Sequence, residues 1–223
     1  MDKKLFIQAI TKFTFGFIII ALLLFIPAGT LNYLNAWLFI GILFVPMFIV
    51  GIILMIKNPD LLRKRLNSKE KEAEQVILLV IGVVMFICGF VVAGFGVRFQ
   101  WYMLPNEVVF AFSFVFLFAY ILYAEVLREN AYLSRTIEVQ ETQKVIDTGL
   151  YAIVRHPMYS ATLLLFLSMP IILGSIYSFI IFLAYPLIIA KRIKNEEKLL
   201  EKELEGYLEY KQKVKYRLIP FIW

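Results

Sequence analysis

The stretch FTFGFIIIALLLFIPAGTLNYLNAWLFIGILFVPMFIVGIILMI, residues 13–56, contains no Asp, Glu, Lys or Arg. A helix that crosses a bilayer needs about 20 apolar residues, so this stretch is long enough for two crossings. Pro27, Gly29 and Asn32 lie near its middle and supply a break between them. In lipid, only helices and closed barrels satisfy all their own backbone hydrogen bonds. The stretch therefore predicts two membrane helices joined by a short turn.

Three further runs without charge follow, at residues 76–97, 108–124 and 158–190. Each of the first two is long enough for one helix. The third is too long for one crossing and short for two, and Gly174-Ser175 divides it into halves of 16 and 15 residues. At about 1.5 Å per residue, each half spans about 23 Å, which suits a tight helical hairpin. We therefore expect an all-α integral membrane protein with about six transmembrane segments, the last two forming this hairpin.

The distribution of positive charge tests this count. With both termini in the cytoplasm, the inner segments hold 3, 6, 4 and 9 Lys and Arg residues, 22 of the chain's 23; these segments are residues 1–12, 57–75, 128–157 and 191–223. Cytoplasmic loops of membrane proteins carry such an excess. If residues 158–190 crossed the membrane only once, the nine Lys and Arg residues of 191–223 would lie on the outer side. The alternative for the first apolar run, a cleaved signal peptide, lacks a convincing small-x-small cleavage site. The chain is thus predicted to be a multi-pass cell-membrane protein with cytoplasmic N- and C-termini.

Composition also argues against several classes of function. One cysteine, Cys88, and one histidine, His156, cannot build an ordinary zinc or iron site, so no metal is expected. The net charge of +6 is explained by basic loops facing an anionic leaflet, and no nucleic-acid partner is expected. The predicted spans carry no clustered ionisable residues, which argues against ion-coupled transport.

The chain divides into two parts. Residues 1–127 hold the N-terminal transmembrane helices and a cytoplasmic connector, 57–75, whose alternating charges predict a helix at the membrane interface. Residues 128–223 hold the hairpin and a cytoplasmic C-terminal helix. Apolar residues at helical spacing predict that this helix runs on through about Val214, with Gly206 weakening it without ending it.

The connector before the hairpin holds the most distinctive local patterns. Polar and apolar residues alternate over 136–146, which predicts a small β-hairpin or an extended arm. Asp147-Thr148-Gly149 then predicts a turn. Pro157 suits the first turn of a helix, so His156 is expected at the helix entrance near the membrane surface. The free N–H groups of that turn favour an anionic group.

The hairpin returns the chain to the side it left. It therefore brings Arg155-His156 near Arg192 and Glu196-Glu197, so that an imidazole, several cations and two carboxylates gather above a membrane-embedded helix pair. A plain belt of charge at the membrane surface is the alternative interpretation of this cluster.

The order of these residues is more specific than any one of them. It resembles the isoprenylcysteine carboxyl methyltransferase (ICMT) family, in its prokaryotic branch, which is related to phospholipid methyltransferases. The residues that carry the resemblance over 128–223 are Thr148-Gly149-Leu150-Tyr151, Val154-Arg155-His156-Pro157-Met158-Tyr159, Arg192, Glu196-Glu197, Tyr207, Tyr210 and Arg217-Leu218-Ile219-Pro220. The family commonly has a Phe-Gly pair shortly before the first of these C-terminal tyrosines, whereas this chain reads Glu203-Leu204-Glu205-Gly206.

The resemblance implies an integral-membrane methyltransferase that uses S-adenosylmethionine without a Rossmann domain. It implies a lipophilic or lipidated substrate that enters sideways from the lipid bilayer. Arg192 and His156 are the implied catalytic residues. The positions matching the cofactor pocket and the turn before it are Gly149, Leu150, Tyr151, Arg155, His156, Tyr159, Glu196 and Glu197.

The methyl acceptor is left open. A carboxylate is already ionised at neutral pH and needs only orientation, which Arg192 could provide by bidentate pairing. An amine must first lose a proton, and His156 is the only imidazole. Carboxyl methylation is therefore the leading hypothesis. The alternatives are a phospholipid or other lipid N-methyltransferase, a non-enzymatic membrane scaffold, and an NADPH-dependent membrane reductase of comparable architecture.

Overall fold

The computed structural model describes residues 3–66, 73–133, 139–140 and 143–223, and within them it is built from helices alone. In chain order these helices are α1 (Lys3–Ala28), α2 (Leu34–Lys57), α3 (Pro59–Leu66), α4 (Ala73–Arg98), α5 (Asn106–Glu129), the 3-10 helix η1 (Gly149–Ala152), α6 (Pro157–Ile172), α7 (Ile176–Phe182), α8 (Tyr185–Glu203) and α9 (Tyr207–Lys213).

The predicted membrane class is confirmed. Five described stretches of helix are long and apolar enough to cross a bilayer: Lys3–Ala28, Leu34–Lys57, Glu74–Arg98, Asn106–Glu129 and Ile176–Glu203. The shorter apolar helix α6, 16 residues long, forms the other arm of the predicted hairpin. The hairpin breaks at residues 173–175, where it was expected to, and its second arm is made of α7 followed by α8.

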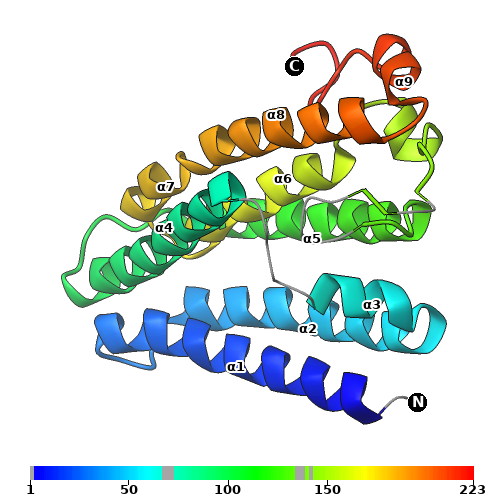
Figure 1. Cartoon of the computed structure of the whole chain (residues 1–223). Coiled ribbons are helices and arrows are strands. Elements are labelled where there is room, and N and C mark those ends of the chain that lie inside the picture. The colour runs from blue at the N-terminus through cyan, green and yellow to red at the C-terminus, as the bar shows by residue number, and fades with distance from the viewer. Residues whose placement is uncertain (1–2, 67–72, 134–138, 141–142) are drawn as a thin grey trace.

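Three of the connections between helices lie together at one end of the bundle. Leu104 N–H donates to the Gly174 carbonyl (2.9 Å), and the buried Tyr33 hydroxyl donates to the Leu173 carbonyl (2.6 Å). These bonds join the α1–α2, α4–α5 and α6–α7 connections. The N-terminus, α3 and α9 lie at the opposite end (Figure 1). The predicted basic segments therefore share one end of the molecule, as the charge count requires.

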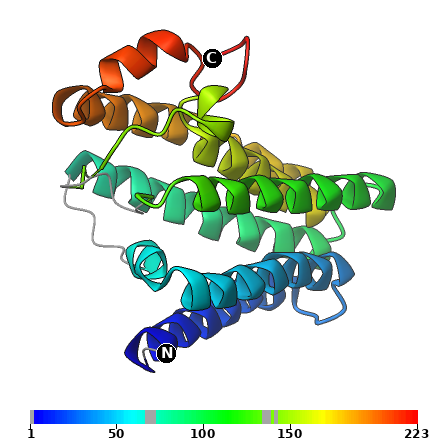
Figure 2. The same ribbon diagram turned by 90° about the vertical axis from the view of Figure 1, so that its right-hand side faces the viewer.

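The helices form three tiers, seen from two sides in Figures 1 and 2. Helices α1 and α2 form one tier, α4 and α5 the middle one, and α6 to α8 the third. Aromatic side chains fill the space between them. Phe39, Phe116 and Phe182 are fully buried, and the Phe86 ring packs edge-on against Phe182 (5.2 Å between ring centroids). Large buried rings contribute much of a core's packing, so this cluster joins the tiers.

Two local predictions can be compared with the structure. Part of the segment 57–75, for which a helix was expected, is helical as α3, and residues 67–72 lie outside the described part. Part of the β-hairpin expected at 136–146 also lies outside it, and the described residues 139–140 and 143–146 are not strand.

The predicted continuous C-terminal helix is wrong. Helix α8 ends at Glu203, and α9 begins at Tyr207 after Gly206, whose φ of +80° is left-handed. Glycine adopts this conformation without the steric cost that other residues meet, so Gly206 turns the chain instead of merely weakening a helix.

Helices α1 and α4 approach each other closely at Gly94. A Cβ atom there would lie 2.6 Å from the Leu24 carbonyl oxygen and 2.9 Å from the Pro27 Cβ. Small residues allow this kind of backbone contact between membrane helices. Gly82 lies on the same helix and has nothing within 4 Å of the equivalent position.

We expect Gly94→Ala to destabilise the folded protein by about 1–3 kcal/mol, because the α1 backbone cannot move aside without disturbing its other contacts. Thermal unfolding of the detergent-purified protein measures the effect. Gly82→Ala is the control and should unfold at or slightly above the wild-type temperature. Equal unfolding temperatures for the two variants would contradict the close contact between α1 and α4.

Candidate active site

A 3-10 turn positions the first wall of the site. Gly149 has a φ of +54°, and a Cβ on it would overlap the Glu129 carboxylate, 1.6 Å from Oε1. That carboxylate accepts a hydrogen bond from Leu150 N–H (3.0 Å to Oε2) and so caps η1. Tyr151 follows within η1, and its hydroxyl accepts a hydrogen bond from Asn130 Nδ2 (2.9 Å). The predicted turn residues thus fix Tyr151 against the end of α5.

The entrance of α6 is held by the C-terminal tail. Pro157 is the first residue of the helix and His156 precedes it, as predicted. Arg155 N–H donates to the Tyr216 carbonyl and His156 N–H to the Arg217 carbonyl, both at 2.9 Å. The tail therefore runs alongside residues 155–156 and fixes their backbone.

Glu197 is the buried centre of the charged cluster. Its side chain is 4% exposed and meets three partners. Arg155 Nε donates to Oε1 (2.8 Å), Arg217 Nε donates to Oε2 (2.9 Å), and His156 Nε2 lies 3.3 Å from Oε1. Arg155 also donates to the Val214 carbonyl (2.6 Å). A buried carboxylate is tolerated only when it is paired and hydrogen-bonded in this way.

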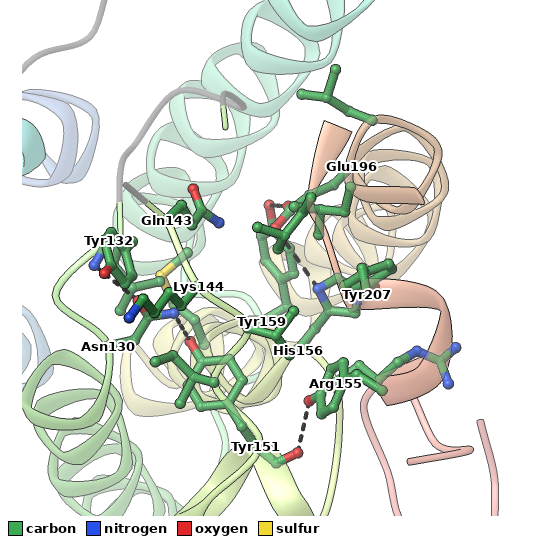
Figure 3. A pocket seen from close by; sticks show the side chains of 18 of the residues that line it. Asn130, Tyr132, Gln143, Lys144, Tyr151, Arg155, His156, Tyr159, Glu196 and Tyr207 are labelled. Atoms are coloured by element: carbon green, nitrogen blue, oxygen red, sulfur yellow. Dashed lines mark hydrogen bonds and ion pairs between the residues drawn. The ribbon is translucent and has the colours of Figure 1, made fainter. Parts of the chain in front are cut away.

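A second chain of hydrogen bonds runs through Tyr159. Arg192 Nε donates to the Tyr159 hydroxyl (2.9 Å), which in turn donates to Glu196 Oε2 (2.6 Å). His156 Nδ1 lies 3.9 Å from Glu196 Oε1. The imidazole is therefore between the two carboxylates of the acidic pair, with one ring nitrogen toward each. Figure 3 shows Tyr159, His156 and Glu196 converging.

These groups line a cavity of about 880 Å³, part of it open to solvent. It lies between the end of α5, the connector 143–146, η1 and helices α6, α8 and α9. Both polar and apolar side chains line it. The polar and aromatic lining residues include Asn130, Tyr132, Gln143, Lys144, Tyr151, Arg155, His156, Tyr159, Arg192, Glu196, Tyr207 and Tyr210, and the apolar ones include Val145, Ile146, Met158, Leu199, Leu200 and Leu204.

Most of the predicted site residues lie at this cavity. Tyr151, Arg155, His156, Tyr159, Arg192 and Glu196 line it, whereas the other three predicted residues, Gly149, Leu150 and Glu197, are not among the lining residues. The first two shape the turn before Tyr151. Glu197 lies behind the wall and holds Arg155 and His156 in place.

Several residues before α6 line the cavity without having been predicted from the sequence. Asn130 and Tyr132 follow α5, and Gln143 and Lys144 lie in the segment between α5 and η1. All four residues line the cavity (Figure 3). The alternating pattern at 136–146 marked this segment as extended. It could not show which of its residues would face a cavity formed by other helices.

Helix α3 supports the cavity from the N-terminal half of the chain. Arg65 donates hydrogen bonds to the Tyr123 hydroxyl and to the sulfur of Met158, the latter at 3.5 Å. Lys64 Nζ donates to Gln140 Oε1 (2.6 Å). Because Met158 lines the cavity, α3 forms an outer layer of its wall.

Charge and burial set the protonation of the site outside the membrane helices. Burial raises the pKa of the Tyr151 and Tyr207 phenols, so both keep their protons at neutral pH and can donate hydrogen bonds. On the outer side, the hydrogen bond from Lys213 Nζ (2.8 Å) and its charge lower the pKa of the Asp147 carboxyl. This exposed ion pair links the segment before η1 to α9.

Comparison with known protein families gives one match. Residues 109–202 match the family described as Isoprenylcysteine carboxyl methyltransferase (ICMT) family. The match runs from α5 into α8, so it covers η1, the entrance of α6 and the acidic pair. A comparison with curated proteins gives no match. The predicted family resemblance is confirmed, and together with the apolar helices it indicates a membrane methyltransferase.

Among the residues that the structure describes, no three His, Cys, Asp or Glu side chains lie together in a way that could hold a metal ion.

We expect Glu197→Gln to lower the free energy of unfolding by about 3–5 kcal/mol, because Arg155 would stay buried without its counter-charge. Thermal unfolding in detergent measures the loss. Glu201→Gln is the matched control on the same helix. Its carboxylate pairs with Lys211, and both side chains are about one third exposed, so the change should cost under about 1 kcal/mol. Equal losses would contradict a central role for Glu197.

Proposed function

Because residues 109–202 form an ICMT-family domain among membrane helices, we propose that the chain transfers a methyl group from S-adenosylmethionine to a carboxylate on a lipophilic or lipidated substrate. The observation that carries the proposal is a pair of opposite charges on one cavity wall. Arg192 and Glu196 both bond to the Tyr159 hydroxyl, at 2.9 and 2.6 Å. The cation suits an acidic acceptor, and the carboxylate suits a cationic cofactor.

The cavity lining fits the proposed cofactor. Its apolar residues, among them Leu200 and Leu204, suit a nucleoside, and Glu196 can pair with an ammonium or with ribose hydroxyls. Tyr151 and Tyr159 would complete the binding surface. When bound, the cofactor supplies a methyl group made electrophilic by its sulfonium.

The side chains then have to position the acceptor and exclude water. A carboxylate is ionised at neutral pH and needs no general base. Arg192 can pair with it through parallel N–H donors, which orients it as well as attracting it. The bond to Tyr159 fixes the guanidinium. Methyl transfer is an in-line displacement, so orientation of this kind provides much of the catalysis.

The His156 ring supports a second candidate, methylation of a lipid amine. If Nε2 carries the ring proton, it donates a hydrogen bond to Glu197. Nδ1 is then unprotonated and faces the cavity that Glu196 lines. An imidazole held by a buried carboxylate in this way can accept a proton from an amine. The two candidates differ in the bond that they form, an ester or an amine.

Binding of S-adenosylhomocysteine to the detergent-purified protein tests the cofactor. By isothermal titration we expect Glu196→Gln to bind about tenfold or more weakly, since a hydrogen bond to a charged group is lost. His156→Ala should also weaken binding. Glu203→Gln, at the exposed end of the same helix, is the control and should bind like wild type.

The same titration tests the other classes of function. If well-folded wild-type protein does not bind S-adenosylhomocysteine, or if Glu196→Gln binds it unchanged, the proposed methyltransferase site is wrong. A non-enzymatic scaffold predicts no binding. A membrane reductase predicts that NADPH binds instead.

Transfer of a radiolabelled methyl group into membrane extracts tests the acceptor. The carboxylate proposal predicts a base-labile label and a rate lowered about 10- to 100-fold by Arg192→Lys, which loses the planar pairing geometry. Lys194→Gln, an exposed position on the same helix, is the control and should leave the rate unchanged. A base-stable label that Arg192→Lys does not affect would favour amine methylation through His156.

A further inference from the structure

Tyr207 has an unusual position at the cavity. It is the first residue of α9, directly after the Gly206 turn, and it is 4% exposed. Its ring belongs to a small apolar cluster separate from the membrane core, formed by Leu204, Tyr207, Tyr210 and Val214, with Val145 and Leu200 packed against it. Tyr207 also lines the cavity. The ring alone could be explained as packing.

The hydroxyl of Tyr207 is not explained by packing. It is buried, and among the described residues it has no hydrogen-bond partner. Three other lining tyrosines are different: Tyr210 donates to the Tyr151 carbonyl (2.7 Å), Tyr151 accepts from Asn130, and Tyr159 bonds to both Arg192 and Glu196. Buried polar groups in native proteins are nearly always paired, because an unpaired one loses its hydration without compensation.

The surroundings of the hydroxyl show what could pair with it. The charges of Glu197, Arg155 and Glu196 act on the phenol, and its ring packs in the apolar cluster. Tyr207, His156 and Arg155 all line the cavity (Figure 3). Tyr207 therefore belongs to an apolar cluster and also lines a cavity that holds charged groups.

A nucleoside has the matching chemistry. Its base is flat and largely apolar on its faces, and its ribose carries hydroxyls where the base joins the polar remainder of the molecule. A buried phenol that keeps its proton is a suitable hydrogen-bond donor at that junction. A ligand that supplied the missing hydrogen bond would remove the cost of burying the hydroxyl.

We propose that Tyr207 is a ligand-binding residue, whose hydroxyl forms its missing hydrogen bond with the nucleoside part of the cofactor. The inference rests on the proposed function. It adds that affinity for the nucleoside depends on the Tyr207 hydroxyl, which forms no hydrogen bond with the described residues of the unliganded protein. A tyrosine that only packed would not show this dependence.

Tyr207→Phe isolates the hydroxyl, because it keeps the ring and breaks no hydrogen bond of the described residues. Two probes are titrated into the full-length protein in detergent: S-adenosylhomocysteine, and 5′-methylthioadenosine, which keeps the nucleoside and lacks the amino-acid tail. We expect Tyr207→Phe to weaken the binding of both probes by roughly three- to tenfold, the usual effect of losing one neutral hydrogen bond. Its unfolding temperature without ligand should equal or exceed that of wild type.

Tyr210→Phe is the matched control, three residues along the same helix. It removes a hydroxyl that donates to the Tyr151 carbonyl, so it should lower the unfolding temperature of the unliganded protein. The two variants thus distinguish a hydroxyl that binds the ligand from one that stabilises the fold.

Several results would overturn the inference. Unchanged binding of both probes by Tyr207→Phe would mean that water or nothing meets the hydroxyl. Weaker binding of S-adenosylhomocysteine alone would assign the hydroxyl to the amino-acid tail. A clear fall in unliganded stability would show a partner within the protein. If wild type bound neither probe, the proposed function itself would fail, and that result is distinct from the other three.

Discussion

The structure of the site depends on one buried carboxylate. Glu197 can be removed from water only if positive or hydrogen-bonding groups surround it, and those groups come from distant parts of the chain. Arg155 and His156 come from the entrance of α6, and Arg217 comes from the tail beyond α9. Satisfying Glu197 therefore requires the hairpin to be closed and the tail to be folded back. The charged cluster forms only when the whole C-terminal region is in place.

The geometry of the cavity wall follows from that constraint. With Nε2 of His156 beside Glu197, the other ring nitrogen is turned toward Glu196. Glu196 is in turn bonded to Tyr159, which also holds Arg192. One residue of the acidic pair thus organises the site from behind, and its neighbour is presented to the cavity. Methyl transfer depends mainly on how donor and acceptor are positioned, and side chains held in place by buried charges can fix those positions.

The sequence predicted the membrane helices and the hairpin well, because lipid permits few other structures for long uncharged runs. It did not show that Glu197 would be the buried member of the acidic pair. Adjacent helical residues point in directions about 100° apart, and which of them is buried depends on where Arg217 docks, a contact between distant segments. Gly206 was misjudged for a related reason. A glycine in a helical pattern is compatible with either continuation or a left-handed turn, and the packing of Tyr207 beside Leu204 and Val214 selects the turn.

The N-terminal half contributes to the site although the family match begins only at residue 109. Arg65 in α3 bonds to Tyr123 and to Met158, and Met158 lines the cavity. The groups proposed to bind the cofactor, Glu196 and Tyr207, lie by contrast on α8 and α9. The two halves therefore divide the cavity: the C-terminal region carries the groups proposed for the cofactor, and the first half supports the wall at the foot of α6. A change in α3 would then alter the shape offered to the acceptor and leave the cofactor groups in place. We therefore expect acceptor preference to depend on residues outside the matched region.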